Sequence, residues 1–167
     1  MEFDVTIEIP RGHRNKYVFD HSAGRIRLDR TLFTATQYPA DYGFVDGTFG
    51  PHVDALDALV LVQEPTFPGC LIRCRAVGMF RMSDESGPTP KVVCVPADDP
   101  RQRHLREITD LDPFLRLEVG HFFEIYKAIE PGKSVVLGED RWAARDVAEA
   151  AIRRAYEVVR QPATTQP

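Results

Sequence analysis

The periodicity of apolar residues changes near residue 96, and this change limits the folds that the chain can adopt. Before it, short segments alternate polar and apolar residues or run apolar between Pro- and Gly-containing turns, a pattern typical of β-strands. The strands expected there cover residues 3–9, 15–20, 25–30, 58–62, 71–80 and 91–95. A polypeptide that begins with many short strands favours a small antiparallel barrel.

After residue 96 the spacing becomes helical. Asp112 is the expected N-cap of a helix, and Pro113 suits its first position because the missing N–H costs nothing there. The helix is expected to end before Pro131-Gly132. A short strand over 133–137 and an amphipathic helix over 141–159 follow. The pattern therefore predicts an α+β fold in which two helices flank a barrel.

Length and charge exclude several classes of protein. The 167 residues predict one domain over 1–160, followed by a flexible tail over 161–167. A net charge of −4 argues against a nucleic-acid surface, which usually carries a basic patch. No apolar run approaches the ~20 residues that a membrane helix needs, and the first residues lack the pattern of a signal peptide. We expect a cytoplasmic protein whose cysteines, 70, 74 and 94, are free thiols.

Two carboxylates precede the apolar run at 58–62. Asp54 and Asp57 stand three residues apart, where they could share a divalent cation, or where one could act as a base beside it. Tyr38 and Tyr42 stand four residues apart in a segment rich in turn residues. Their phenols either point into a shared cleft or pack in the core, and the sequence leaves both alternatives open.

The ordered motifs resemble those of soluble family I inorganic pyrophosphatases, in their short bacterial, actinobacterial-like form. The motifs are Ile7-Glu8-Ile9-Pro10, Lys16-Tyr17, Asp29-Arg30, Tyr38-Pro39, Asp41-Tyr42-Gly43, Asp54 with Asp57, Pro68-Gly69, Val77-Gly78, Asp84-Glu85, Lys91, Val95-Pro96, His121-Phe122-Phe123 and Tyr126-Lys127. The resemblance covers about residues 3 to 155. It implies a five-stranded barrel of the oligonucleotide/oligosaccharide-binding type, usually in hexamers, and Mg²⁺-dependent attack of water on pyrophosphate.

The same resemblance implies roles for individual residues. Asp54 matches the general base, and Tyr42 joins it as a catalytic candidate. The phosphate-binding candidates are Lys16, Arg30, Tyr38, Lys91, Tyr126 and Lys127. The metal-binding candidates are Glu8, Asp57 and Asp84. Cations and phenols of this kind hold phosphoryl oxygens, while carboxylates hold the metal that activates water.

Three positions depart from the family pattern on the metal side. The motif Asp-x-Asp-Pro-x-Asp begins here with His52, a site Glu is replaced by Val18, and a site Asp is replaced by Thr89. Neither imidazole nor an alkyl group is an oxygen ligand of the kind that Mg²⁺ requires. The sequence therefore predicts fewer Mg²⁺ ions than the family norm, with Mn²⁺, Zn²⁺ or Co²⁺ as alternatives because imidazole suits later metals.

Three functions remain compatible with this pattern. The first is a diverged homologue that binds a diphosphate through its cations and phenols and acts on an organic diphosphate. Val18 and Ile125 make part of the site less polar, which would admit an organic tail, although both could equally repack the core. The second is an active inorganic pyrophosphatase with an altered metal site. The third is a non-catalytic protein that only binds a diphosphate or a partner. In each case we expect a homo-oligomer.

Overall fold

The computed structural model describes residues 1–50 and 53–160. Its strands are β1 (Glu2–Ile9), β2 (Asn15–Asp20), β3 (Arg25–Thr31), β4 (Asp41–Val45), β5 (Asp57–Val60), β6 (Leu71–Phe80), β7 (Ser83–Asp84), β8 (Gly87–Pro88), β9 (Lys91–Pro96), β10 (Val135–Val136) and β11 (Trp142–Ala143). Its helices are α1 (Pro113–Ile125) and α2 (Arg145–Arg160), with 3₁₀ turns at Pro100–Gln102 and Ile108–Asp110.

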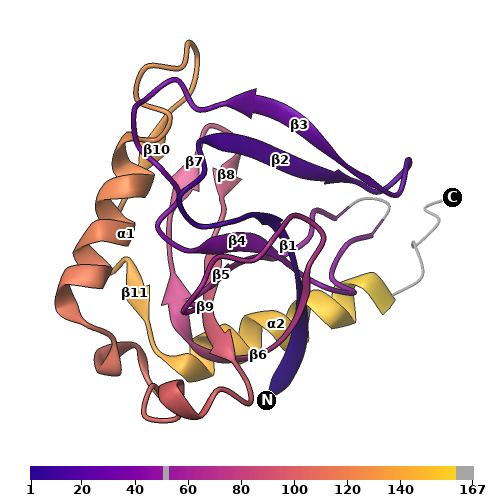
Figure 1. Cartoon of the computed structure of the whole chain (residues 1–167), viewed down its shortest axis with the longest axis vertical. Helices are drawn as coiled ribbons and strands as arrows, with labels where there is room; N and C mark the ends of the chain where they lie inside the picture. The colour runs from indigo at the N-terminus through magenta and orange to yellow at the C-terminus, as the bar shows by residue number, and fades with distance from the viewer. Residues whose placement is uncertain (51–52, 161–167) are drawn as a thin grey trace, which may run out of the picture.

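Five strands form a closed barrel, as predicted. They pair in the order β1-β4-β5-β9-β6, and β6 also pairs with β1, which closes the ring (Figure 1). The barrel is mixed rather than wholly antiparallel, because β5 and β9 run parallel. The chain turns back through β6 between these two strands, so it enters β9 in the direction in which it left β5.

Alternating side chains of the barrel strands pack into two hydrophobic clusters. On β5, Leu59 joins a cluster with Phe122 and Phe123 of α1. Its neighbours Ala58 and Val60 point to the opposite side and join a cluster that includes Ile152 of α2. The strand is therefore buried on both faces, which explains its continuous apolar sequence.

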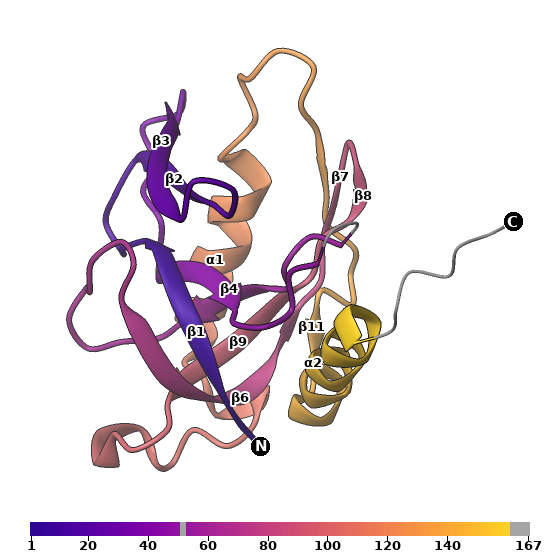
Figure 2. The same ribbon diagram turned by 90° about the vertical axis from the view of Figure 1, so that its right-hand side faces the viewer.

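The helices cover different sides of the barrel (Figures 1 and 2). Helix α1 begins as predicted, since the Asp112 side chain accepts a hydrogen bond from the backbone N–H of Phe114 and Pro113 takes the first position. Helix α2 begins later than the sequence indicated. Trp142 and Ala143 instead form β11, which adds to the edge of β6 opposite Phe80 and Met79.

The segments that the sequence left irregular are partly ordered. Residues 41–45 form β4 rather than a loop, and the predicted loop at 86–90 carries β8, which pairs with β7 in a small sheet completed by β10. Strands β2 and β3 form a separate hairpin with the predicted bounds, extended by Thr31. The tail expected at 161–167 lies outside the described residues.

The turn of the β2–β3 hairpin, the loop between β4 and β5, and the C-terminal end of α2 lie on one side of the molecule (Figure 1). This grouping brings the first strands and the last helix to one cavity. Among the described residues, no helix has the length and apolar character needed to cross a membrane.

Candidate active site

One cavity of about 680 Å³ collects most of the residues singled out in the sequence. Its lining includes Glu8, Lys16, Val18, Tyr42, Asp54, Asp57, Asp84, Thr89, Lys91, Tyr126 and Lys127. Its volume falls in the range of small-molecule sites, on the order of 300–1,000 Å³. We call this cavity the cleft. Arg30 and Tyr38 are not in its lining, and His52 lies outside the described residues.

Glu8 projects from β1 into the cleft, because its neighbours Ile7 and Ile9 are buried on the other face of the strand. Its carboxylate accepts a hydrogen bond of 2.7 Å from the backbone N–H of Phe19 on β2. Burial raises the pKa of Glu8 to about 7, against the lowering effect of that N–H, and the nearby Asp57 raises it further. Glu8 is therefore partly protonated near neutral pH.

The register of β5 and β9 places Asp57 opposite Lys91. The Lys91 ammonium, whose side chain is 3% exposed, lies 2.6 Å from Oδ2 of Asp57 and 2.7 Å from Oγ1 of Thr89. Thr89 Oγ1 lies 3.3 Å from the same carboxylate oxygen. Thr89, where the resemblance expects an acid, thus lies beside a lysine that is already paired with Asp57.

A second lysine is paired in a similar way. Lys127, directly after α1 and its C-cap Tyr126, contacts Asp84 of β7 at 2.9 Å and Glu85 at 3.5 Å. Desolvation acts to raise the pKa of Asp84, but hydrogen bonds from Lys127 and from the backbone of Ser86 outweigh it and lower the pKa. Asp84 is therefore ionised at neutral pH, and its charge is balanced by Lys127.

The phenols of the cleft stay neutral. Burial raises the pKa of Tyr42 well above its ordinary value, and the carboxylate of Asp57 adds to the effect. Burial and Asp84 similarly raise the pKa of Tyr126. Burial and the nearby Arg30 lower the pKa of Lys16, which lies on β2. The cleft thus offers neutral O–H donors and ammonium groups to an anion.

Arg30 and Tyr38 lie beside the cleft rather than in its lining. The guanidinium of Arg30 forms a two-pronged pair with the buried carboxylate of Glu130, at 3.0 and 2.9 Å. Tyr38 is 2% exposed, and its ring packs against those of Tyr42 and Phe122. The two alternatives for the tyrosine pair therefore each hold for one residue. Tyr38 packs in the core, whereas Tyr42 lines the cleft.

An aromatic wall of the cleft was not among the features predicted from the sequence. Phe19 and His21, two residues apart at the end of β2, line it together with Phe44 and Phe49 of the β4–β5 region, and Ala155 of α2 completes this side. The alternation of β2 was an available signal, since residues two apart share a face. The long-range contact with the β4–β5 loop had no signal in the sequence.

The divalent metal implied by the resemblance fits the cleft only under one condition. In the described part of the chain, no three His, Cys, Asp or Glu side chains converge in a way that could hold a metal. Asp57 and Asp84 already have lysine partners. Mg²⁺ is, however, commonly bound by one or two carboxylates together with substrate phosphates. The residues present therefore fit a cation that shares its ligands with a bound phosphate group.

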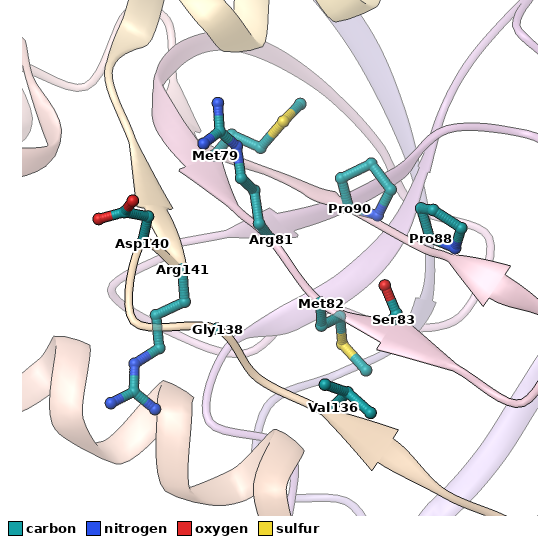
Figure 3. Close-up of a pocket in the computed structure, with 10 residues that line it drawn as sticks. All are labelled: Met79, Arg81, Met82, Ser83, Pro88, Pro90, Val136, Gly138, Asp140 and Arg141. Atoms are coloured by element: carbon teal, nitrogen blue, oxygen red, sulfur yellow. The ribbon is translucent and has the colours of Figure 1, made fainter.

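A second cavity of about 550 Å³ is lined in part by Ser83 of β7, Pro88 of β8 and Val136 of β10 (Figure 3). It shares Pro88 and Pro90 with the cleft, and Met79 and Met82 give it an apolar interior. The side chains of its two arginines point in different directions in Figure 3, so they do not form one anion site. Its chemistry therefore differs from that of the cleft.

Comparison with known proteins identifies relatives of the whole domain. The family model described as inorganic pyrophosphatase matches residues 5–160. An inorganic pyrophosphatase of Streptomyces coelicolor is 64% identical over 157 residues, which cover 94% of this chain and 95% of that protein. One from Leifsonia xyli subsp. xyli is 50% identical and covers 89% of this chain and 88% of its own length.

Solved structures agree with this assignment. The crystal structure of the inorganic pyrophosphatase from Thermus thermophilus superimposes with a TM-score of 0.91 at 40% identity, covering 96% of this chain and 92% of that one. The matched segment includes every described residue of the cleft lining. The chain therefore belongs to the inorganic pyrophosphatase family.

Proposed function

We propose that the cleft binds inorganic pyrophosphate together with a divalent cation and catalyses its hydrolysis to two phosphates. The observation that carries this proposal is the convergence of Lys16, Lys91 and Lys127 with carboxylates in one cavity. The names of the relatives support this function over that of an organic diphosphate enzyme.

Each group of the cleft has a role in this proposal. The three lysines and the neutral phenols of Tyr42 and Tyr126 donate hydrogen bonds to phosphoryl oxygens, and charged donors make such bonds stronger. Asp54 is exposed and lines the same cavity, so it can take the proton of the attacking water. The cation, when bound with the substrate, neutralises charge and makes water more acidic. We assign Mg²⁺, in fewer ions than the family norm, with Mn²⁺, Zn²⁺ or Co²⁺ as alternatives.

The direct test is phosphate release from pyrophosphate with each of these four cations. We expect release above a metal-free blank, and a higher rate in the triple variant Val18→Glu, His52→Asp, Thr89→Asp, because the new carboxylates would hold the cation without help from the substrate. Each acid can add a ligand, so the gain should be largest with Mg²⁺. Absence of release from the native chain with every cation would contradict this function.

A matched pair of lysine variants controls for loss of charge. Lys16→Ala removes a cation of the cleft, whereas Lys133→Ala removes one that pairs with Glu85 outside the lining. We expect the first to weaken pyrophosphate binding and the second to leave it unchanged. Equal effects of the two variants would mean that the lysines act only through the overall charge.

A second function is favoured by the apolar part of the cleft. Val18 lines it beside Phe19, Phe44 and Leu56, so an organic group attached to a diphosphate would meet an apolar surface next to the ammonium groups. Turnover of prenyl, nucleoside or sugar diphosphates at a higher rate than pyrophosphate would favour this alternative. Tight binding of pyrophosphate without turnover of any diphosphate would instead indicate a non-catalytic binding protein.

The proposal extends to assembly and location. The resemblance implies a hexamer, and α1 supports self-association because Phe114 and Leu117 expose 72% and 65% of their surface. We assign the protein to the cytoplasm, where pyrophosphate is produced by biosynthetic reactions. The acidic balance opposes a nucleic-acid partner.

A further inference from the structure

The aromatic wall of the cleft is an ordered stack. The imidazole of His21 and the ring of Phe49 lie face to face, with centroids 3.6 Å apart and planes inclined by 2°. Phe19 and Phe44 pack against His21 at 4.9 and 5.4 Å, with their planes at 71° and 57° to the imidazole. The stack therefore ends at Phe49.

Phe49 is a partly exposed aromatic residue in the lining of the cleft. Its side chain is 41% exposed, and in the described part of the chain His21 is its only aromatic partner. The imidazole covers one face of the Phe49 ring, and the exposed part of Phe49 is accessible to a planar group. Offset stacking on such a ring is favourable for aromatic ligands.

The loop that carries Phe49 is held in place from two sides. The buried hydroxyl of Thr48 donates to the carbonyl of Val45 at 2.6 Å and accepts from the N–H of Leu56 at 2.9 Å. Gly47 adopts a positive φ of 76°, and a Cβ there would approach Tyr156 of α2 at 3.4 Å. The ring of Phe49 is therefore positioned before any ligand binds, so little entropy is lost on stacking.

We infer that the cleft binds nucleoside diphosphates, with the diphosphate at its lysines and the base stacked on Phe49. This inference rests on the proposed diphosphate site, since it uses Lys16, Lys91 and Lys127 for the anion. The stack and the lysines line one cavity of about 680 Å³, which leaves room for a nucleoside as well as its phosphates.

The exposure of the stack favours a nucleobase over a prenyl chain. An aliphatic tail gains most where it is removed from water, and Phe49 and His21 are exposed. A base has a flat face for the ring and polar edges that remain hydrated. Stacking of this kind tolerates different bases because each has a π-face, so we expect little preference among them.

The test compares two non-hydrolysable probes by titration calorimetry with Mg²⁺ present. One is methylenediphosphonate, an analogue of pyrophosphate, and the other is α,β-methylene-ADP. We expect the native chain to bind the nucleotide more tightly than methylenediphosphonate. Phe49→Ala should weaken nucleotide binding about 10-fold more than it weakens methylenediphosphonate binding.

Three further variants show whether the flat ring is responsible. Phe49→Leu keeps an apolar side chain without a planar face and should behave like Phe49→Ala, whereas Phe49→Trp should bind the nucleotide at least as tightly as the native chain. Phe67→Ala removes another exposed ring, 64% exposed and outside the cleft, and should change neither affinity. A thermal melt of each variant checks that the fold is kept.

The outcomes separate this inference from the proposed function. If methylenediphosphonate binds and the nucleotide binds no more tightly, the inference fails and the diphosphate site stands. If Phe49→Leu keeps the native preference for the nucleotide, the base does not stack on Phe49, although the cleft still binds the nucleoside. If neither probe binds, the inference falls together with the site on which it rests.

Discussion

At the scale of single residues, folding strongly changes the ionisation of Glu8. Its pKa rises from an ordinary 4.5 to about 7, mainly through burial. A carboxyl with a raised pKa stabilises the fold while it is protonated, and this contribution is lost as the pH rises through the folded pKa. The folded protein should therefore become less stable between about pH 4.5 and pH 7, in buffer without divalent cations.

Glu8→Gln isolates this effect because glutamine is neutral and can still accept the N–H of Phe19. We expect the native chain and the variant to have similar free energies of unfolding at pH 4. Above pH 7 the native chain should be less stable than the variant by roughly 3 kcal/mol. This is the free energy that corresponds to the raised pKa of Glu8. Urea titrations of both proteins at pH 4 and 8 measure the difference. A difference that does not change with pH would contradict the raised pKa.

The same scale shows what the sequence can predict about a site. Motif matching identified Lys91, Lys127, Asp57 and Asp84, and the structure brings all four into one cleft. It could not foresee that the lysines would pair with these carboxylates, because the pairs join different strands and the end of a helix. Nor could it place Arg30, whose guanidinium is held by Glu130, one hundred residues away.

At the scale of elements, the close approach of β1 and β4 requires a glycine. A Cβ at Gly43 would lie 1.9 Å from the carbonyl oxygen of Thr6, a backbone atom that cannot move aside. Gly43→Ala should therefore lower the free energy of unfolding by at least about 2 kcal/mol or prevent folding. Gly120→Ala is the control, since a Cβ there would meet only Arg141 at 3.7 Å, and it should stabilise α1 by about 0.5–1 kcal/mol. Thermal denaturation measures both.

The parallel pairing of β5 and β9 supports a second prediction. Lys91→Met should destabilise the fold by about 2–3 kcal/mol, because it leaves Asp57 without its cation in a site where the lysine is almost fully buried. The double variant Asp57→Asn, Lys91→Met should recover part of this loss. A double-mutant cycle measured by urea denaturation gives the coupling energy between Asp57 and Lys91. If the two substitutions change the free energy of unfolding additively, the ion pair contributes nothing to stability.

The sequence predicted most elements but not how they pair. The apolar run at 58–62 indicated a buried strand, and β5 is one, yet a run of this kind carries no information about strand direction. Trp142 and Ala143 fit the helical periodicity of the residues that follow them. They form β11 instead because β6 offers an edge next to them, which is a tertiary effect.

At the scale of the whole molecule, the exposed apolar side of α1 predicts self-association. Leu117→Glu places a charge on a surface where the native side chain is 65% exposed. If this surface lies between subunits, the variant should shift the mass measured by sedimentation towards the monomer, while Val136→Glu, also 65% exposed but on β10, should not. A native chain that sediments as a monomer would contradict the proposed assembly.

The lining of the cleft runs from Glu8 on the first strand to Ala155 on the last helix. No proteolytic fragment that lacks either end can contain the complete site. A ligand of the cleft therefore stabilises all of these elements together, by about 2.7 kcal/mol when its free concentration is one hundred times its Kd. Ligand binding should consequently protect both ends of the domain from proteases. Removal of either end should in turn abolish ligand binding.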